Sequence, residues 1–253
     1  MPQTEISTLT YNLPKLVNEN GGQTRIFIPK YGNINERRHQ LHEVIRLSGI
    51  NLIIDDMDMP LIIKVASIPK ERMQVYFIDS EDYFKGRSGY SKDENNKLYK
   101  DNDERSIFFS KGVIETIKKL NWAPDLIHVH GWIASLLPLY MKYYYKDDPI
   151  FDGTKVVVSL YENALDGKMD KNFVKKIKYD EIDDSNLTLL NESTYENLYK
   201  IALKYADGAI LTSDLKNKFS SVLKNIDIPI LECPHSSDDY KEKYTEFYNS
   251  FLL

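Results

Sequence analysis

The sequence has few of the features that mark secreted, disulfide-rich or membrane proteins. Its 253 residues contain one cysteine, Cys233, which excludes an internal disulfide and favours a reducing compartment. No apolar run approaches the roughly 18 residues that a membrane-spanning helix needs. The N-terminus also lacks the basic start and apolar core of a signal peptide. We therefore expect a cytoplasmic protein with no membrane partner.

Positive charge is also scarce. The 33 Lys and Arg residues are outnumbered by 38 Asp and Glu residues, which gives a formal net charge of -5 without any block of basic residues. Because nucleic-acid binding needs a concentrated positive surface, we expect no nucleic-acid partner. His128 and His130 are the nearest approach to a metal site, but two ligands without a third make none. Neither a metal nor another cofactor is expected.

The chain has instead a regular alternation of apolar, strand-like runs and helical patterns. Such alternation predicts an α/β fold, a Rossmann-like, doubly wound and mostly parallel sheet in a single domain. Strands are expected at 25–29, 73–79, 126–129, 155–160, 208–212 and 228–232, and helices at 5–20, 103–120, 133–145, 195–206, 214–224 and from about 238.

Residues 47–72 break this alternation. They contain two apolar strand candidates, at 52–54 and 61–65, separated by a turn at 55–60. We expect a small antiparallel insertion here that returns to the main sheet with the strand at 73–79.

The first expected element is a helix with no strand in front of it. A Rossmann-like sheet normally begins with a central strand and a glycine-rich turn into the first helix. Omitting a central strand would leave both its neighbours without ladder partners. We therefore expect the first strand to lie upstream, with Met1 as a truncated or internal start.

The most informative segment runs from Trp122 to Trp132 and contains an apolar strand, two histidines and a tryptophan. Open α/β sheets bind ligands in loops at the carboxyl ends of parallel strands. An indole face covers the C–H surface of a sugar and an imidazole bonds a hydroxyl, so Trp132 and His130 are candidate sugar-binding residues. Alternatively His128 and His130, which share one face of the strand, are hydrogen-bonded locally.

Several further segments form a series in a fixed order along residues 10–225. They are Leu13-Pro-Lys15, Arg25-Ile-Phe-Ile-Pro-Lys-Tyr-Gly32, Val75-Tyr-Phe-Ile-Asp79 with Tyr83-Phe84, Tyr99-Lys-Asp-Asn-Asp-Glu-Arg105, Pro124-Asp-Leu-Ile-His-Val-His-Gly-Trp132 and Tyr205-Ala-Asp207. This series resembles the N-terminal domain of bacterial glycogen and starch synthases, which are ADP-glucose-dependent glucosyltransferases of GT-B fold. The resemblance implies that residues 1–253 are one such domain, without the C-terminal nucleotide-binding domain.

The resemblance also implies site residues. Asp101, Asn102 and Arg105 are its best retained positions, with Asp101 bonding sugar hydroxyls. His130 and Trp132 follow as a sugar-facing platform. Taken by themselves, Asp101 or Asn102 also suits a helix N-cap, with Arg105 pairing one turn on.

Departures from the family put transfer in doubt. Its donor loop should occupy the first eight residues, but this stretch has no lysine or glycine to receive a diphosphate, and Glu5 would repel one. Gly131 stands where the family has an aspartate. Tyr161 stands where it has the histidine that faces the reacting glucose, and could fill the vacated pocket.

Three functions remain open. The first is a divergent half of a glycogen synthase that binds α-glucan without turnover alone. The second is an active glucosyltransferase, retaining and metal-free, that uses ADP-glucose and is completed by a second polypeptide carrying the nucleotide-binding domain. The third is a non-catalytic structural or regulatory module.

Overall fold

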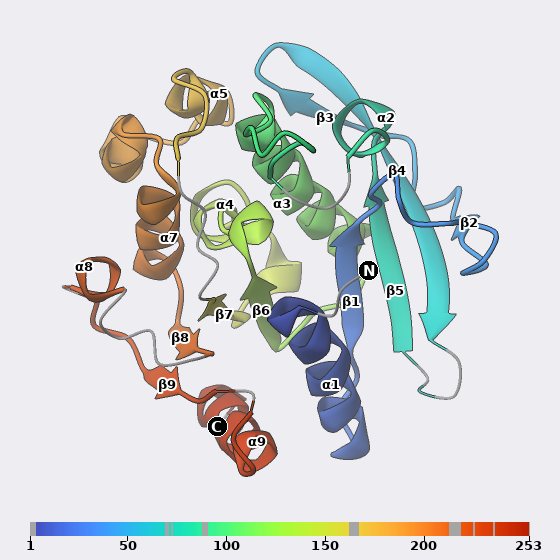
Figure 1. Ribbon diagram of the computed structural model, residues 1–253, viewed down its shortest axis with the longest axis vertical. Helices are drawn as coiled ribbons and strands as arrows, with labels where there is room; N and C mark the ends of the chain where they lie inside the picture. The colour runs from blue at the N-terminus through green and yellow to red at the C-terminus, as the bar shows by residue number, and fades with distance from the viewer. Residues whose placement is uncertain are drawn as a thin grey trace.

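The computed structural model describes residues 4–68, 71, 73–87, 91–161, 167–212, 219–224, 226–234 and 236–252. Within them the chain folds into two β-sheets with helices packed against them (Figure 1). The predicted α/β class is confirmed. However, the strands that we expected in one sheet are divided between a mixed sheet and a parallel sheet.

The mixed sheet contains the antiparallel insertion. β5 (Met73–Asp79) lies between β1 (Arg25–Pro29), to which it is parallel, and β4 (Met57–Ile68), to which it is antiparallel. β3 (Ile50–Ile54) and the short β2 (His42–Glu43) pair antiparallel with β4. The insertion therefore forms as predicted in its described residues, and the chain returns from it to the main sheet through β5, which pairs with β1.

The second sheet is parallel throughout. Its order is β6 (Leu126–His130), β7 (Lys155–Leu160), β8 (Gly208–Leu211) and β9 (Ile230–Glu232). Each strand begins and ends within two residues of its predicted position. The carboxyl ends of these strands therefore lie at one edge, where the sequence placed the His130–Trp132 loop.

Helices connect the strands, mostly where the hydrophobic periodicity predicted them. They are α1 (Glu5–Glu19), α2 (Glu81–Phe84), α3 (Asn102–Lys119), η1 (Trp132–Ala134), α4 (Leu137–Tyr143), η2 (Pro149–Phe151), α5 (Phe173–Lys178), α6 (Asp184–Leu187), η3 (Thr188–Asn191), α7 (Tyr195–Lys204), α8 (Ser220–Leu223) and α9 (Tyr240–Leu252). Within the described residues, no helix combines the length and apolar character that crossing a bilayer requires.

The helices differ from the expectations in two places, and a third expected helix is described only in part. The helix expected at 133–145 is divided into η1 and α4, because Pro138 has no N–H group and fits only the first turn of α4. The segment 167–191 holds short helices that were missed, since four to six residues show no periodicity. Of the helix expected at 214–224, residues 214–218 lie outside the described ranges, and α8 is the described remainder.

The parallel sheet is covered on both faces. Val157 of β7 packs with Leu9 of α1 and Tyr244 of α9 in one apolar cluster. Its neighbours Val156 and Val158 belong to the larger core, which α3, α4 and α7 share. Alternation along one strand thus serves two helix layers, as a doubly wound sheet requires.

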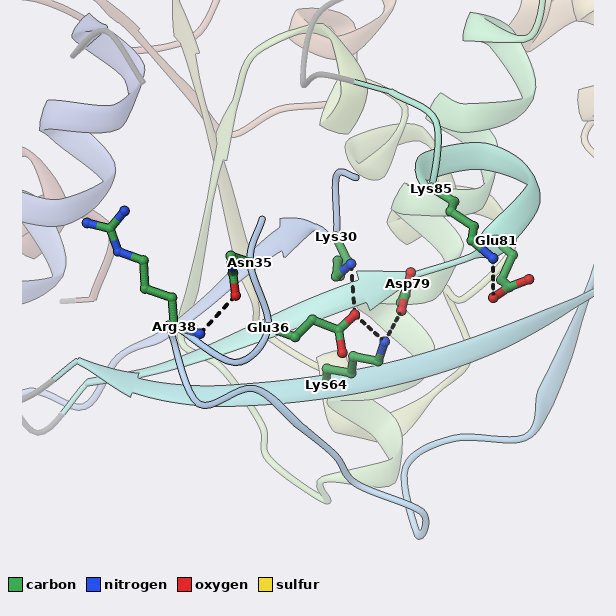
Figure 2. Close-up of polar contacts among 8 residues, drawn as sticks. All are labelled: Lys30, Asn35, Glu36, Arg38, Lys64, Asp79, Glu81 and Lys85. Carbon is green, nitrogen blue, oxygen red and sulfur yellow. Dashed lines mark hydrogen bonds and ion pairs between the residues drawn. The ribbon is translucent and has the colours of Figure 1, made fainter. Parts of the chain in front are cut away.

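A charge network fixes the segment that follows β1 (Figure 2). Lys64 Nζ on β4 lies 2.8 Å from Glu36 Oε1 and 2.8 Å from Asp79 Oδ2 at the end of β5. Lys30 Nζ lies 2.8 Å from the same oxygen of Glu36. Each charge has a partner of opposite sign in this network, so it joins the insertion to the main strands and leaves no cation for a ligand.

Candidate functional site

The candidate site lies where α3 begins. Asp101 is the residue before α3, but its side chain makes no capping hydrogen bond. Its Oδ2 accepts a hydrogen bond from Arg87 Nη2 at 2.9 Å. Its Oδ1 is buried and, like Arg87 Nε, has no hydrogen-bond partner among the described residues. Buried polar atoms are normally paired, so these two groups are suited to bind a further polar ligand.

The first turn of α3 is held by Asn102. Its Nδ2 donates to the carbonyl of Ser91 and to the hydroxyl of Tyr195, both at 2.8 Å. Its Oδ1 accepts a hydrogen bond from Arg105 Nη1 at 2.8 Å. The amide is therefore committed to positioning the helix start and the guanidinium, and it is 1% exposed.

Arg105 is fully buried, at 0% exposure, inside a group of aromatic rings. Burial lowers the pKa of its guanidinium, and aromatic faces stabilise the cation. Its guanidinium carbon lies 5.8 Å from the ring centre of Tyr31, 5.7 Å from Phe84, 5.4 Å from Tyr99 and 5.6 Å from Trp132. We call Asp101, Asn102, Arg105, Tyr99 and Trp132 the Arg105 cluster.

The Arg105 cluster joins segments that are far apart in the sequence. Trp132 comes from the loop after β6 and is half-buried. It packs edge-on against Tyr195 of α7, with ring centres 5.8 Å apart. Tyr99 also stacks on Arg87, whose guanidinium lies 4.3 Å from its ring centre. Together with Arg87, the cluster combines a carboxylate, two guanidinium groups and aromatic faces, which is the chemistry that binds sugar hydroxyls and C–H surfaces.

His130 lies in a second cluster. Its Nδ1 is hydrogen-bonded to the hydroxyl of Tyr161, and its ring centre lies 3.9 Å from that of His128. His128 bonds Tyr248 of α9 through Nδ1 and Ser159 through Nε2, both at 2.7 Å. We call these five residues the histidine cluster.

The histidine cluster is uncharged at neutral pH. Burial lowers the pKa of His130 to about 4 and holds the pKa of His128 well below its ordinary value, with His130 as a smaller cause. Burial also raises the pKa of Tyr161 well above its ordinary value. Neutral imidazoles carry no positive charge to offset that of a departing phosphate and offer it hydrogen bonds at most.

Gly131 separates the two clusters. Its backbone has φ 74° and ψ 171°, a region that essentially only glycine occupies. The conformation turns the chain so that His130 joins the histidine cluster and Trp132 joins the Arg105 cluster. A Cβ added here would lie 3.5 Å from Ile6 Cδ1, so the limit is backbone strain rather than space. The replacement of the family's aspartate by Gly131 is consistent with this backbone.

The six candidate residues therefore divide into two groups. Asp101, Asn102, Arg105 and Trp132 come together, whereas His130 lies with Tyr161 on the other side of Gly131. The sequence reading did not single out Tyr195, although its hydroxyl positions Asn102. Tyr31 lies in the motif Arg25–Gly32 and Tyr99 in the motif Tyr99–Arg105. That position in the two motifs was the signal that could have identified them.

A buried ion-pair group joins the first turn of α3 to α5. Lys176 Nζ lies 2.7 Å from Asp103 Oδ2 and 2.6 Å from Glu104 Oε1, and Glu104 Oε2 accepts a hydrogen bond from Tyr83 at 3.0 Å. Burial raises the pKa of Asp103, against the lowering effect of Lys176. This group connects α5 to α3 and so fixes the direction in which Asp101 and Arg105 project.

The described residues form neither a metal site nor a phosphate site at the start of α1. No three His, Cys, Asp or Glu side chains there are placed to hold a metal ion. At the start of α1, Thr4 Oγ1 accepts from the N–H of Ser7, and Ser7 Oγ accepts from the N–H of Thr4. This capping box occupies two backbone donors that a phosphate at a helix start would need.

Comparison with known proteins identifies one family. Residues 4–215 match the family model for the starch synthase catalytic domain. Glycogen synthase of Chlorobium limicola is 34% identical over 204 residues, which are 81% of this chain and 41% of that protein. Glycogen synthase of Chlorobaculum tepidum is 37% identical over 203 residues, covering 80% of this chain and 41% of that protein.

A solved structure shares the fold. The catalytic domain of Starch Synthase IV from Arabidopsis thaliana, bound to ADP and acarbose, matches with a TM-score of 0.69 and 17% sequence identity. The match covers 91% of this chain and 48% of that one. The chain thus spans less than half the length of the relatives that it matches.

Proposed function

The chain belongs to the starch synthase catalytic domain family, and on that premise we propose that residues 1–253 act as its glucan-binding N-terminal part. The substrate class is an α-1,4-glucan, held at the Arg105 cluster. The proposed setting is the cytoplasm, without a metal or other cofactor.

The observation that carries this proposal is the buried Oδ1 of Asp101, which has no hydrogen-bond partner in the part of the chain that the structure describes. A carboxylate oxygen accepts hydrogen bonds from the paired hydroxyls of a sugar ring, and a bond to a charged group contributes about 1.5 to 3 kcal/mol. Arg87 Nη2 holds the other oxygen at 2.9 Å and so orients the carboxylate. The nearby faces of Tyr99 and Trp132 are suited to the apolar side of the same sugar.

Transfer by these 253 residues alone is not part of the proposal. Glucosyl transfer from ADP-glucose, the family's reaction, needs positive charge or free backbone donors around the departing diphosphate. The histidine cluster is neutral, Thr4 and Ser7 use their own backbone donors, and Glu5 adds negative charge nearby. Turnover would require donor-binding groups from the part of the relatives' length that this chain does not span, on the same or a second polypeptide.

The test is a calorimetric titration of the protein with maltoheptaose and, separately, with ADP-glucose. We expect maltoheptaose to bind with a Kd of about 1 mM or tighter, and ADP-glucose not to bind. Trp132→Ala should abolish the maltoheptaose signal. Trp122→Phe is the matched control, because the chain has two tryptophans and Trp122 stacks instead on Arg25, at 4.4 Å.

Each other outcome contradicts a stated part of the proposal. Tight ADP-glucose binding would show that the donor site is intact and would favour an active glucosyltransferase. The absence of a binding signal with both ligands would favour a structural or regulatory module. Equal loss of binding in both tryptophan variants would mean that the glucan does not bind at the Arg105 cluster.

A further inference from the structure

A polar cavity of about 650 Å³ lies at the amino-terminal ends of β1 and β5. Its lining comes from the C-terminal part of α1, the turn that leads into β1, and the first residues of the two strands, and it includes no aliphatic or aromatic side chain. The Arg105 cluster lies beyond the other end of β1, where Tyr31 follows Pro29. We call this second location the Arg25 cavity.

Arg25 supplies the cation of the Arg25 cavity. Among the described residues, none accepts a hydrogen bond from its guanidinium or forms an ion pair with it, and its Nη1 is buried. The guanidinium carbon lies 4.4 Å from the ring centre of Trp122. Stacking on a ring orients a guanidinium without using its N–H groups. Because buried polar atoms are normally paired, Arg25 is suited to bind an acceptor in this cavity.

Two amide side chains add donors beside Arg25. Gln74 is opposite Arg25 in the parallel register of β1 and β5, and its Oε1 accepts a hydrogen bond from the hydroxyl of Tyr76 at 2.8 Å. Asn18 Oδ1 accepts one from the hydroxyl of Thr24 at 2.9 Å. Since both amide oxygens are already used, the amide nitrogens are the groups that these two side chains offer to a ligand.

The remaining charges of the lining limit the ligand to one negative charge. Lys15 Nζ lies 2.9 Å from Glu71 Oε1, so these two charges offset each other. Glu19 is exposed at the end of α1, whose last turn has no basic residue to balance the negative end of the helix dipole. A phosphate group carries about −1.5 to −2 at pH 7 and would be repelled here. A carboxylate carries a single charge and matches the planar guanidinium.

We propose that the Arg25 cavity binds a small hydroxylated monocarboxylate, a molecule of the sugar-acid class. The carboxylate accepts hydrogen bonds from Arg25. The hydroxyl groups accept hydrogen bonds from the amide nitrogens of Asn18 and Gln74 and donate to the carboxylate of Glu19. This site is separate from the Arg105 cluster and does not depend on the glucan-binding function proposed above.

The first measurement titrates the chain with gluconate, which has one carboxylate and several hydroxyl groups. Trp132→Phe leaves Trp122 as the only tryptophan of the 253 residues, so the fluorescence of this variant reports on the ring that stacks on Arg25. We expect a saturable change with a Kd of about 1 mM, and the same Kd by calorimetry of the unsubstituted chain. Glucose, which lacks the carboxylate, and inorganic phosphate should each bind at least about tenfold more weakly.

The second measurement substitutes the cation. Arg25→Lys keeps the positive charge but lacks the planar guanidinium, and it should raise the Kd for gluconate about tenfold or more. Arg46→Lys is the matched control, because Arg46 is exposed between β2 and β3 and does not line the cavity. It should leave the Kd unchanged. Both variants should bind maltoheptaose as the unsubstituted chain does, and thermal unfolding shows that both are folded.

Four results would overturn the proposal. An equal Kd for gluconate in the two lysine variants would show that the ligand binds away from Arg25. Phosphate binding as tight as that of gluconate would contradict the limit of one negative charge, and equally tight glucose binding would show that the carboxylate is not recognised. The absence of a saturable signal up to about 50 mM gluconate would mean that the guanidinium is bonded only to water.

Discussion

The two polar clusters on either side of Gly131 differ in how far they satisfy themselves. In the histidine cluster both nitrogens of His128 and Nδ1 of His130 are bonded to protein hydroxyls. In the Arg105 cluster Asp101 leaves one buried oxygen without a partner among the described residues. A cluster that bonds most of its polar atoms internally stabilises the fold, whereas one that leaves a buried acceptor unpaired is suited to a ligand.

The largest expected effect comes from removing the guanidinium group at the centre of the Arg105 cluster. Arg105→Met should lower the free energy of unfolding by about 3 kcal/mol, because Asn102 loses a charged donor and the rings lose a cation. Urea denaturation measures this loss. Arg87→Met is the control at a half-buried position, with an expected loss of about 1 kcal/mol or less. Equal losses would mean that Arg105 is not the structural centre of its cluster.

Gly131→Ala should remove the separation between the clusters at a cost of about 2 kcal/mol, since φ 74° with ψ 171° strains any residue with a Cβ. Gly86→Ala is a matched control. A Cβ there meets nothing within 4 Å, and its φ is not positive, so little change is expected. If both substitutions have the same effect on unfolding, the backbone at Gly131 is not as constrained as its angles indicate.

Acid should lower the contribution that the histidine cluster makes to the free energy of unfolding. The folded pKa of His130 is about 4, below its unfolded value of about 6.5, so below pH 6.5 the unfolded chain binds a proton that the folded chain does not. Its contribution to stability is therefore full above pH 6.5 and is lost as pH falls toward 4, by up to about 2 kcal/mol at pH 5.

Unfolding free energies of the wild type and His130→Asn, measured from pH 7 to pH 5, isolate this contribution from other titrating groups such as Asp103. The wild type should lose more stability than the variant over that range. Parallel curves would show that His130 does not titrate in this window.

The smallest stability effect is expected from Tyr161→Phe. The substitution removes only the hydroxyl that bonds His130 Nδ1, and one hydrogen bond contributes about 1 kcal/mol. Thermal unfolding measures it, with Tyr205→Phe as a control at a partly exposed hydroxyl that makes two longer bonds, of 3.3 Å, to Asn186. A larger loss in the control would mean that the histidine cluster contributes little to the fold.

Much of the fold could be predicted because each strand and long helix has its own local pattern. Leu126–His130 and Lys155–Leu160 are recognisable from apolar runs alone. The division into two sheets could not be predicted in this way, because it depends on what lies between β1 and β6 rather than on either strand.

The site was less predictable for a similar reason. His130 and Trp132 are two residues apart, and spacing suggested one shared platform. The backbone conformation of Gly131 places them in different clusters. The φ and ψ angles of a glycine cannot be predicted from its identity, because glycine adopts many conformations. Tyr195 joins Asn102 from 93 residues away, a contact that only the packing of α7 creates.

The most direct test of the account compares one substitution in each cluster by titration with maltoheptaose. Asp101→Asn removes the negative charge of the carboxylate whose Oδ1 has no partner among the described residues, and it should weaken binding about tenfold or more. Tyr161→Phe should leave the Kd unchanged. If Tyr161→Phe weakens binding and Asp101→Asn does not, the glucan binds at the histidine cluster, and the central claim is wrong.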